Sequence, residues 1–358
     1  MAELGSTAAM SPVSSHRLQI EPARMAPGWL ITPRSYLADR IVPACEDIRL
    51  PAKSFGGGAL SFEIGEVTTR SSMNRGLKGH LKRLAPTTRI EDGVIVDLRR
   101  NNPKNWAHIL TNHLPICFII AVKLGLHPSE MRPVLPRRTP IHIRRATELF
   151  GFSPILSDDA LQGRGIRFEV KPWIGIRSAR HIWVQTPFVR QALARARLDA
   201  PSERPLPSRV FISRRDARRL VNEAEIAKLL SAEGFEMLYA EDLSVIEQFR
   251  LFDRAETIVA IHGAGLAPLL YRSPSALPAT VVELFPCGHV TDVWRAGCGQ
   301  TGCRWIGVRG KIRPEHLRHA YDLRRPFLRY SLQDFEVDPV SVKRSLSGEN
   351  FDNVMGEA

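Results

Sequence analysis

The sequence is poor in the features that mark several protein classes. Aromatic residues make up 7% of its 358 residues, and they are scattered rather than interleaved with basic clusters, which disfavours a nucleic-acid-binding face. Its longest apolar run, within residues 114–126, is interrupted by Lys123 and is too short to span a bilayer. The start of the chain has no basic segment followed by an apolar one, so we expect no signal peptide.

Cysteines are few and lack a metal-binding pattern. Their number, five, is odd, and the chain is long enough to form two hydrophobic cores without disulfides. Cys298 and Cys303 have no matching second pair and no nearby His at zinc spacing. We therefore expect a reducing, cytoplasmic setting and no metal site.

Acidic residues are too few to balance the basic ones. Lys and Arg number 50 against 37 Asp and Glu, which gives a formal net charge of +13. Short Arg clusters are spread along the chain, so no single basic tail explains this charge. Excess positive charge favours polyanionic partners such as nucleic acid, an anionic lipid surface or a phosphorylated substrate.

Proline and small polar residues indicate the domain organisation. Residues 1–27 are rich in Ser, Ala, Pro and Met, and we expect a flexible arm there. Three prolines within residues 200–208 predict a semi-rigid connector. The sequence therefore predicts an N-terminal α/β domain over residues 28–200, a second domain over 201–325 and a tail over 326–358.

Hydrophobic patterning predicts α/β structure in both domains. In the first domain we expect a strand at residues 93–98 and helices at 105–124, 141–150 and 181–198. The second domain reads as strands at 209–213, 235–240, 257–261, 280–285 and 304–308, with helices at 220–233, 243–255, from 264 and at 290–299. A last helix is expected at 339–346. This alternation indicates a parallel, doubly wound sheet.

One strand of the second domain ends in an unusual turn. The apolar residues 257–261 run directly into His262, Gly263, Ala264 and Gly265. Ligands of parallel sheets bind at the carboxyl ends of the strands, and glycine lets a ligand approach the backbone closely. The N–H groups at the start of the following helix suit a phosphate group, to which His262 can also donate. The turn is therefore a candidate diphosphate site.

A second strand end carries arginines. Arg214 and Arg215 follow the strand at 209–213, where two guanidinium groups can bind a diphosphate through paired hydrogen bonds. The alternative is a solvated basic loop. That alternative is a fair interpretation of Arg215, Arg218 and Arg219, and it fits Arg214 less well.

A third strand end carries a carboxylate. Glu283 lies in the otherwise apolar strand at 280–285, where it can accept hydrogen bonds from a ribose diol, or instead form a structural salt bridge. No G-x-G-x-x-G segment follows the strand at 209–213, which disfavours a nicotinamide dinucleotide site.

Three segments together resemble glycosyltransferase family 61. They are VFISRRDARRLVNEAEI, GFEMLYAEDLSVIEQFRLFDRAETIVAIHGAGLAPLLY and ATVVELFP. The family has patterns close to S-R-R-x-A, E-x-L-S-x-x-E-Q, H-G-A-G-L and V-V-E-L in this order. The resemblance is strong over residues 205–310 and weaker over 105–115. It implies a GT-B-like α/β fold, in which two Rossmann-like domains with parallel sheets face each other across a cleft.

The resemblance also implies a donor site on the second domain. Its residues would be Arg214, Arg215, Glu241, Gln248, His262, Gly263, Ala264, Gly265, Leu266 and Glu283. Arg214 and His262, with the amides of residues 263–265, would hold a diphosphate, and Glu283 would hold the ribose. Glu241 and Gln248 would line or brace the pocket. The cationic side chains would stabilise the departing nucleotide in place of a metal or other cofactor.

The acceptor side departs from the family pattern. The acidic residue that the family has four positions after a histidine falls here on Asn112, which cannot act as a base. His113 or His108 could substitute, because a neutral imidazole can accept a proton from a sugar hydroxyl. Asp97 and Asp158 are further alternatives. Either histidine could instead be a buried structural residue.

The resemblance therefore predicts a cytoplasmic, inverting, metal-independent glycosyltransferase. We expect it to move a sugar from a nucleotide-diphosphate donor, a UDP-sugar, to a hydroxyl of a glycan or lipid-linked glycan in bacterial surface-polysaccharide synthesis. The basic surface predicts peripheral association with the anionic inner face of the membrane, and no specific nucleic acid is expected. Three alternatives remain: a catalytically impaired member that binds nucleotide sugars, an NAD-dependent oxidoreductase and a nucleic-acid-binding protein.

Overall fold

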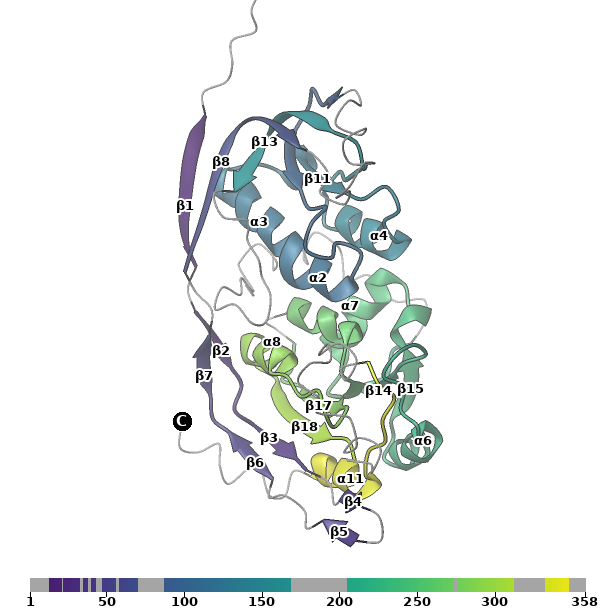
Figure 1. Ribbon diagram of the computed structural model, residues 1–358. Helices are drawn as coiled ribbons and strands as arrows, with labels where there is room; N and C mark the ends of the chain where they lie inside the picture. Colours follow the sequence, from purple (N-terminus) through teal and green to yellow (C-terminus); the bar gives the residue numbers. More distant parts are fainter. Residues whose placement is uncertain are drawn as a thin grey trace, which may run out of the picture. The chain divides into compact units, whose positions relative to one another are not determined.

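The structure is a computed structural model that divides the chain into two compact units (Figure 1). It describes residues 13–20, 22–32, 35–37, 40–42, 47–55, 58–69, 87–168, 205–273, 276–311 and 332–347. Unit 1 consists of Met1–Pro22 and Gly56–Ile182, and unit 2 of Ala23–Phe55 and Trp183–Ala358. The expected helix at 181–198 lies outside the described residues.

Unit 1 is built on a mixed seven-stranded sheet. Its order is β1 (Ser14–Ile20), β8 (Gly58–Thr69), β13 (Leu161–Phe168), β10 (Val94–Asp97), β11 (Met131–Leu135) and β12 (Ile155–Leu156), and β9 (Thr88–Arg89) pairs with β13. The strands from β13 to β12 are parallel, whereas β8 is antiparallel to both β13 and β1. The sequence predicted a parallel sheet, and the antiparallel side is a correction. Antiparallel strands tolerate a solvated face, which suits the largely exposed β1.

A long apolar helical segment packs against this sheet. The predicted helix at 105–124 consists of α2 (Trp106–His108), the π-helix η1 (Ile109–His113) and α3 (Leu114–Lys123). Pro115 lacks an N–H, and in a regular helix its ring would clash with the carbonyl four residues earlier. The wide turn η1, in which the N–H of Leu114 bonds to the Ile109 carbonyl, immediately precedes it. Sequence therefore explains the π-turn.

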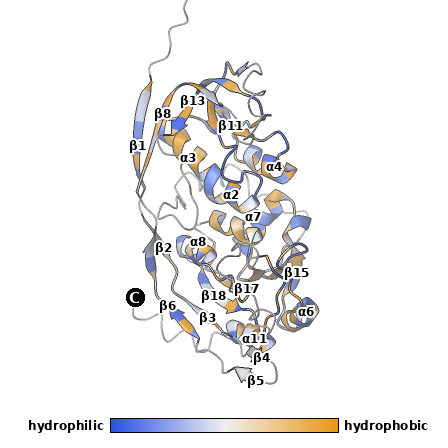
Figure 2. Cartoon of the chain, viewed as in Figure 1, coloured by the Kyte–Doolittle hydropathy of each residue, from blue (hydrophilic) through white to orange (hydrophobic). Residues whose placement is uncertain are grey.

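This segment forms part of the hydrophobic core of unit 1. Figure 2 shows α3 as apolar along its length, and its residues from Leu114 to Ala121 are buried. In the described part of the chain, the stretch Trp106–Lys123 is long and apolar enough to cross a membrane by length and composition, but 78% of it is buried inside the protein. The helix predicted at 141–150 is also present, as α4 (Ile141–Leu149), and η2 (Pro128–Glu130) lies between α3 and β11.

Unit 2 contains the doubly wound sheet that the sequence predicts. Its order is β15 (Glu236–Tyr239), β14 (Arg209–Ser213), β16 (Thr257–Ile261), β17 (Thr280–Phe285), β18 (Arg304–Arg309), β3 (Gly28–Ile31) and β6 (Ile48–Leu50). All neighbouring pairs from β15 to β3 are parallel. Because β14 precedes β15 in the chain, the order of the strands reverses between β14 and β16.

The N-terminal segment contributes to both units, which differs from the predicted boundaries. Strand β1 lies within the expected flexible arm, and β3 lies within the range expected for the N-terminal domain. Yet β3 pairs with β18 in unit 2, and its Ile31 is fully buried there. The short strands β2 (Ala23–Met25), β7 (Lys53–Phe55), β4 (Ser35–Leu37) and β5 (Arg40–Val42) also belong to this segment. Pairing between strands so distant in the chain leaves no mark in the local pattern.

Helices cover both faces of the unit 2 sheet (Figure 1). On one face Phe211, Val259, Val282 and Ile306 form a core with residues of α6 (Glu223–Ala232) and α11 (Pro339–Ser347). The short helices η3 (Ala240–Asp242) and η4 (Ala264–Tyr271) and the helices α7 (Val245–Arg254) and α8 (Val293–Thr301) complete the unit, and η4 packs against α7 and α8. Side chains alternate along a strand, so Glu283 points to the face opposite Val282.

Candidate active site

The predicted arginine and histidine lie together at one edge of the unit 2 sheet. Adjacent parallel strands end at the same edge, and β14 and β16 flank the point where the strand order reverses, which is where open α/β sheets bind ligands. Arg214 follows β14, and His262 follows β16. The Nη1 atom of Arg214 donates a hydrogen bond to the His262 carbonyl oxygen at 3.2 Å. The two residues that the sequence paired are therefore neighbours.

The first glycine of the turn makes this neighbourhood possible. A Cβ atom at Gly263 would lie 1.7 Å from Nη1 of Arg214. At Gly265 a Cβ would meet only the methyl carbons of Ala240 and Ile212, at 3.6 and 3.8 Å. The glycine is needed at position 263 because the guanidinium packs directly on the backbone, whereas position 265 has room for a methyl group.

A second guanidinium joins the site, from a residue that we expected to be solvated. Nη1 of Arg218 donates to the same His262 carbonyl oxygen at 2.9 Å. The backbone of Arg218 has φ of 64°, a left-handed conformation that turns the chain after β14. The prediction for Arg218 was therefore wrong. The spacing of four residues between Arg214 and Arg218 was the available signal. The left-handed turn that brings Arg218 to His262 depends on tertiary structure and could not be predicted from that spacing.

Both guanidinium groups are partly desolvated. Burial lowers the pKa of Arg214. Burial, with a further contribution from the charge of Arg214, lowers the pKa of Arg218 to about 10. Both side chains remain protonated at neutral pH. Two like charges held together at low solvent exposure repel each other, and a bound anion would relieve that repulsion.

His262 and Glu283 form a buried pair beneath the arginines. Their strands are adjacent and parallel, with Ala260 opposite Glu283. Nδ1 of His262 lies 2.5 Å from Oε1 of Glu283, and Nε1 of Trp305 donates to the other carboxyl oxygen, Oε2, at 2.8 Å. The His262 ring also stacks on Phe285, with centroids 5.1 Å apart. The imidazole is therefore held in one orientation.

This pair carries little of the positive charge of the site. Burial, together with the charges of Arg218 and Arg214, lowers the pKa of His262 to about 3. Burial raises the pKa of Glu283 well above its ordinary value. His262 is therefore a neutral imidazole at neutral pH, and the two guanidinium groups supply the charge.

The expected ribose contact of Glu283 does not fit its surroundings. Its side chain is 0% exposed, and both carboxyl oxygens are hydrogen-bonded within the protein. The alternation of side chains along β17 directs this carboxyl group to the buried face of the sheet opposite Val282. Trp305 is a partner that sequence reasoning missed, since nothing in the local pattern of β18 indicates it.

Arg215 also departs from its expected role. Both of its terminal nitrogens donate to the carboxylate of Asp242, at 2.5 Å each, and its guanidinium lies over the Tyr239 ring at 3.9 Å. Glu241 is a more distant acidic neighbour, with its Oε1 3.9 Å from Nη1 of Arg215. Arg215 thus joins the loop after β14 to the loop after β15, instead of facing the turn at His262.

The remaining predicted donor residues support the loops around the site. Nε2 of Gln248 donates to the carbonyl oxygens of Ala240 and Leu243, at 2.9 and 3.3 Å, which agrees with a bracing role. Leu266 is 1% exposed and its N–H donates to the Gly263 carbonyl oxygen, so it belongs to the core and not to a ligand surface. Ala264 is partly exposed at the start of η4.

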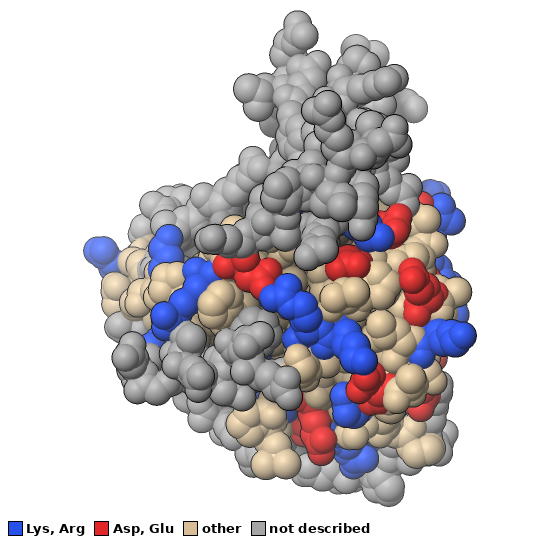
Figure 3. All heavy atoms as spheres, turned by 90° about the horizontal axis from the view of Figure 1, so that it is seen from below, with Lys and Arg blue, Asp and Glu red and all other residues tan. Residues whose placement is uncertain are grey.

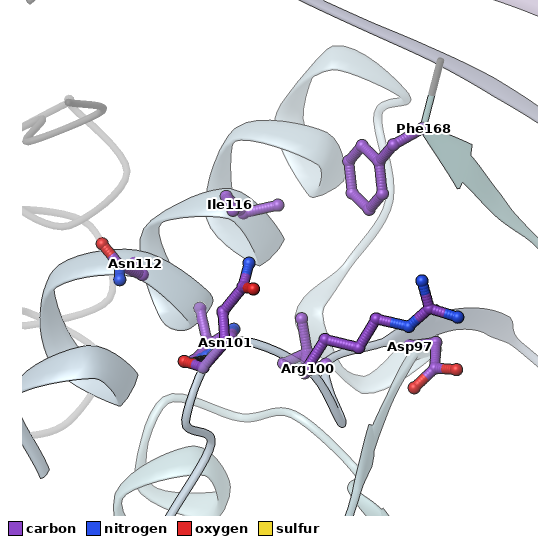
Figure 4. Close-up of a pocket in the computed structure, with 8 residues that line it drawn as sticks. Asp97, Arg100, Asn101, Asn112, Ile116 and Phe168 are labelled. Carbon is purple, nitrogen blue, oxygen red and sulfur yellow. Dashed lines mark hydrogen bonds between the residues drawn. The ribbon is translucent and has the colours of Figure 1, made fainter. Parts of the chain in front are cut away.

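Unit 1 has a small cavity at the carboxyl end of its strand β10. The cavity has a volume of about 50 Å³ and is lined by Asp97, Leu98, Arg100, Asn101, Asn112, His113, Ile116 and Phe168. Figure 4 shows Arg100 and Asn101 extending from the loop after β10 toward Ile116 and Phe168. Asn101 and Asn102 both have left-handed backbones, with φ of 59° and 58°. Such conformations cost energy and concentrate at functional sites, as do π-turns like η1.

Hydrogen bonds distinguish the three expected catalytic residues of unit 1. Nε2 of His113 lies 3.3 Å from the Asn101 carbonyl oxygen. A carbonyl only accepts, so Nε2 carries the hydrogen and Nδ1 is the basic atom. In His108, Nδ1 instead accepts from Nδ2 of Asn112 at 3.3 Å. His113 is therefore arranged as a base, while the basic nitrogen of His108 is occupied.

The protonation state of His113 is compatible with this arrangement. Burial lowers its pKa to about 4, so the ring is neutral at physiological pH. Burial also lowers the pKa of His108. A neutral His113 can accept a proton, whereas the amide of Asn112 cannot.

The two alternative carboxylates are held in structural interactions. Asp97 lines the cavity but accepts two hydrogen bonds from the guanidinium of the buried Arg99, at 2.9 Å each. Arg99 also donates to Thr69 and to the carbonyl oxygens of Ser157 and Asp159. Asp158 accepts from the backbone N–H of Arg137 at 3.2 Å.

The cysteines and acidic residues of the described segments form no metal-ligand cluster. Cys117, Cys287, Cys298 and Cys303 are buried free thiols. Among the described residues, no group of three or more His, Cys, Asp or Glu side chains could hold a metal ion.

Comparison with known proteins supports one protein family. Residues 106–282 match the family model Glycosyltransferase 61. The chain is also 34% identical over 109 residues to beta-1,2-xylosyltransferase XAX1 of Oryza sativa subsp. japonica. That match covers 29% of this chain and 19% of the rice protein, so the chain spans about a fifth of the relative's length.

A solved structure is similar over most of the chain but only loosely. It is the dodecameric iron-containing heptosyltransferase TibC in complex with ADP-D-beta-D-heptose, which aligns over 92% of both chains at 12% identity with a TM-score of 0.35. A similarity this low carries no argument about fold. The similarity to known proteins therefore depends on the family match and the rice relative.

Proposed function

We propose that this chain is a member of glycosyltransferase family 61, as its match over residues 106–282 supports, and that it transfers a sugar from a nucleotide-diphosphate donor to a hydroxyl of a glycan or lipid-linked glycan. The family match and the rice relative support glycosyltransferase activity. The nature of the donor, the stereochemistry and the role of metal are the parts that we add. We take a UDP-sugar as the donor.

The observation that carries this proposal is the convergence of Arg214 and Arg218 on the His262 carbonyl. The two guanidinium groups, the neutral imidazole of His262 and the backbone of the turn offer hydrogen-bond donors where strand order reverses. A nucleoside diphosphate gains negative charge as it leaves the sugar, and donors fixed in advance stabilise that charge. Two arginines can supply this stabilisation without a divalent ion, which supports metal-independent transfer.

Acceptor activation is assigned to His113. In an inverting transfer a base removes the proton of the acceptor hydroxyl while the oxygen attacks the anomeric carbon and the nucleoside diphosphate departs. The lone pair of His113 Nδ1 can take that proton, because Nε2 is committed to the Asn101 carbonyl. A GT-B-like fold, which the family resemblance implies, is part of this proposal.

The acceptor and the cellular setting are further parts of the proposal. On the face drawn in Figure 3, Lys and Arg side chains lie among Asp and Glu side chains. We retain a lipid-linked or polymeric glycan as acceptor, a cytoplasmic location and peripheral contact with an anionic membrane as parts of the proposal. The net charge of +13 supports the last of these. Synthesis of a bacterial surface polysaccharide is the role in which these parts agree.

Binding of nucleotides to the intact chain tests the donor proposal. UDP, GDP, CMP and NAD are compared by thermal shift and by calorimetry, each with and without EDTA. UDP is expected to raise the melting temperature by mass action, with equal affinity in EDTA. Arg214→Met should weaken UDP binding by about tenfold to a hundredfold, as expected for loss of one to two charge-assisted hydrogen bonds. Arg219→Met is the matched control, since its guanidinium pairs with Asp334.

Two outcomes would overturn the donor proposal. Preferential binding of NAD would favour an oxidoreductase, and loss of UDP affinity in EDTA would show that a metal is required. If UDP binds, UDP-xylose is the first donor to test for hydrolysis and transfer, because the rice relative is named as a xylosyltransferase.

A second candidate is a family member that binds nucleotide sugars without transferring them. Asn112 at the position of the family's acidic residue favours it. Slow hydrolysis of the UDP-sugar that is lost in His113→Ala but retained in Lys123→Ala would support catalysis. Binding without hydrolysis in the unmodified protein would support the second candidate.

A further inference from the structure

The Glu283, His262 and Trp305 side chains form a hydrogen-bonded chain whose proton positions can be worked out. Trp305 Nε1 always carries a hydrogen, so Oε2 of Glu283 must accept. The other carboxyl oxygen, Oε1, lies 2.5 Å from Nδ1 of His262. One hydrogen lies between these two atoms, and it belongs either to the carboxyl group or to the imidazole.

Burial decides between the two possibilities. The Glu283 side chain is 0% exposed, and an ionised carboxylate there would lose its hydration without a cation in direct hydrogen-bond contact among the described residues. Its surroundings include Asp292 and the Cys298 thiol, and Arg218 is a more distant attractive charge. The ring of His289 also contacts the His262 ring, with centroids 5.1 Å apart. The neutral acid is favoured, in agreement with the raised pKa of Glu283.

We propose that Glu283 is a positioning residue, which keeps its proton and donates it to Nδ1 of His262, so that Nε2 of His262 carries a hydrogen directed to the donor phosphate. A neutral imidazole has one hydrogen and one lone pair, so a donor at Nδ1 fixes the hydrogen on Nε2. With an ionised Glu283, Nδ1 would carry the hydrogen and Nε2 would present a lone pair that repels a phosphate oxygen. Only the statement about the phosphate rests on the proposed function.

The tautomer can be measured directly on the unliganded protein. The full chain is labelled with ¹⁵N, and the ring nitrogens of His262 are identified by their loss in His262→Asn. Long-range ¹H–¹⁵N correlation spectra then report which nitrogen is protonated. The proposal expects a protonated Nε2 and an unprotonated Nδ1 at pH 7. A protonated Nδ1 would overturn it.

Conservative substitution gives a second test. In Glu283→Gln, Trp305 still requires an acceptor, so the amide oxygen faces Trp305 and the amide NH₂ group faces Nδ1 of His262. This reproduces the hydrogen pattern of a protonated acid. We expect Glu283→Gln to keep the wild-type tautomer and a dissociation constant for UDP within about threefold, and Glu283→Leu to weaken UDP binding by about tenfold or more through a free imidazole.

Removing the tryptophan hydrogen separates positioning from packing. The double variant Glu283→Gln with Trp305→Phe has no tryptophan N–H to hold the amide oxygen, so the amide can rotate. We expect this double variant to lose the fixed His262 tautomer that each single variant keeps. An ionised Glu283 predicts the reverse for Glu283→Gln alone, namely a change of tautomer. If wild type shows the expected tautomer but no UDP binding, the donor proposal fails while the role of Glu283 stands. If Glu283→Leu keeps both tautomer and affinity, the positioning role is refuted.

Discussion

Replacing Gly263 by alanine tests whether the turn holds Arg214 for an anion. The new Cβ would lie 1.7 Å from Nη1 and 3.0 Å from Cζ of Arg214. An ordinary van der Waals separation is about 3.5 Å, so the guanidinium must move by about 1.8 Å. Hydrogen bonds extend over only about 2.7–3.2 Å, so this shift breaks the bond to the His262 carbonyl and removes the donor from its phosphate position.

The expected loss of affinity follows from one charge-assisted hydrogen bond. Such a bond contributes about 1.5–3 kcal/mol, which corresponds to a rise of about 10-fold to 150-fold in the dissociation constant. Isothermal titration with UDP at a temperature where both proteins are folded measures it. Gly265→Ala is the matched control, since its nearest neighbours would be at 3.6 and 3.8 Å. We expect its affinity to stay within about twofold, a difference of about 0.4 kcal/mol.

A double-mutant cycle separates this effect from strain in the backbone. Gly263 has φ of 159°, so alanine also costs folding stability, which a melting curve records. If the affinity loss acts through Arg214, then Gly263→Ala should cost little further affinity in an Arg214→Met background. An equal loss in both backgrounds would refute the reasoning, because it would place the effect in the turn itself.

Three further predictions concern charge and protonation. Arg218→Met should weaken UDP binding by about tenfold or more, while Arg219→Met should not. Calorimetry measures the affinity of both variants for UDP, and equal affinities would contradict a role of Arg218 in the donor site. His113→Gln should abolish UDP-sugar turnover without changing UDP affinity, whereas His108→Gln should retain turnover. In the unmodified protein the rate of turnover should fall only as the pH drops toward 4, because His113 must be neutral to accept a proton. The pKa of His113, about 4, lies below the ordinary value of 6.5, so below that pH the unfolded chain binds more protons at this residue than the folded chain does. The stability that depends on a neutral His113 should therefore be complete above pH 6.5 and be lost as the pH falls toward 4, and His113→Leu should flatten this part of the decline of the melting temperature.

The cavity and the arginine site follow one structural rule in two separate units. Each lies at the carboxyl end of parallel strands, the cavity beyond β10 and the arginines beyond β14 and β16. The pattern of strands in the sequence was sufficient to indicate the edge in unit 2, but not the one in unit 1. Which side chains meet there depends on turns of the backbone, such as the left-handed residues Asn101 and Arg218.

The sequence by itself determined the strands of unit 2 from β14 to β18 and the proximity of Arg214 to His262. Apolar runs of five or six residues separated by amphipathic helices leave a parallel sheet as the compact arrangement, and adjacent parallel strands end at the same edge. It also indicated the turn at Gly263, since small residues there permit close approach of another group. These inferences succeeded because each depends on local periodicity or on strand adjacency.

Tertiary structure alone decided the features that depend on distant partners. Strand β3 joins the sheet of unit 2 because β18 offers it an unpaired edge, although more than 270 residues separate them in the chain. Arg215 pairs with Asp242 and Arg218 turns inward because of the loop between them, and two arginines in one short cluster look alike in sequence. Glu283 lies beneath the site and bonds to His262 and Trp305, since the pleat of β17 directs it to the buried face. Local patterns specify which residues can form strands and helices, but the partners of a buried charge are fixed only when distant strands come together.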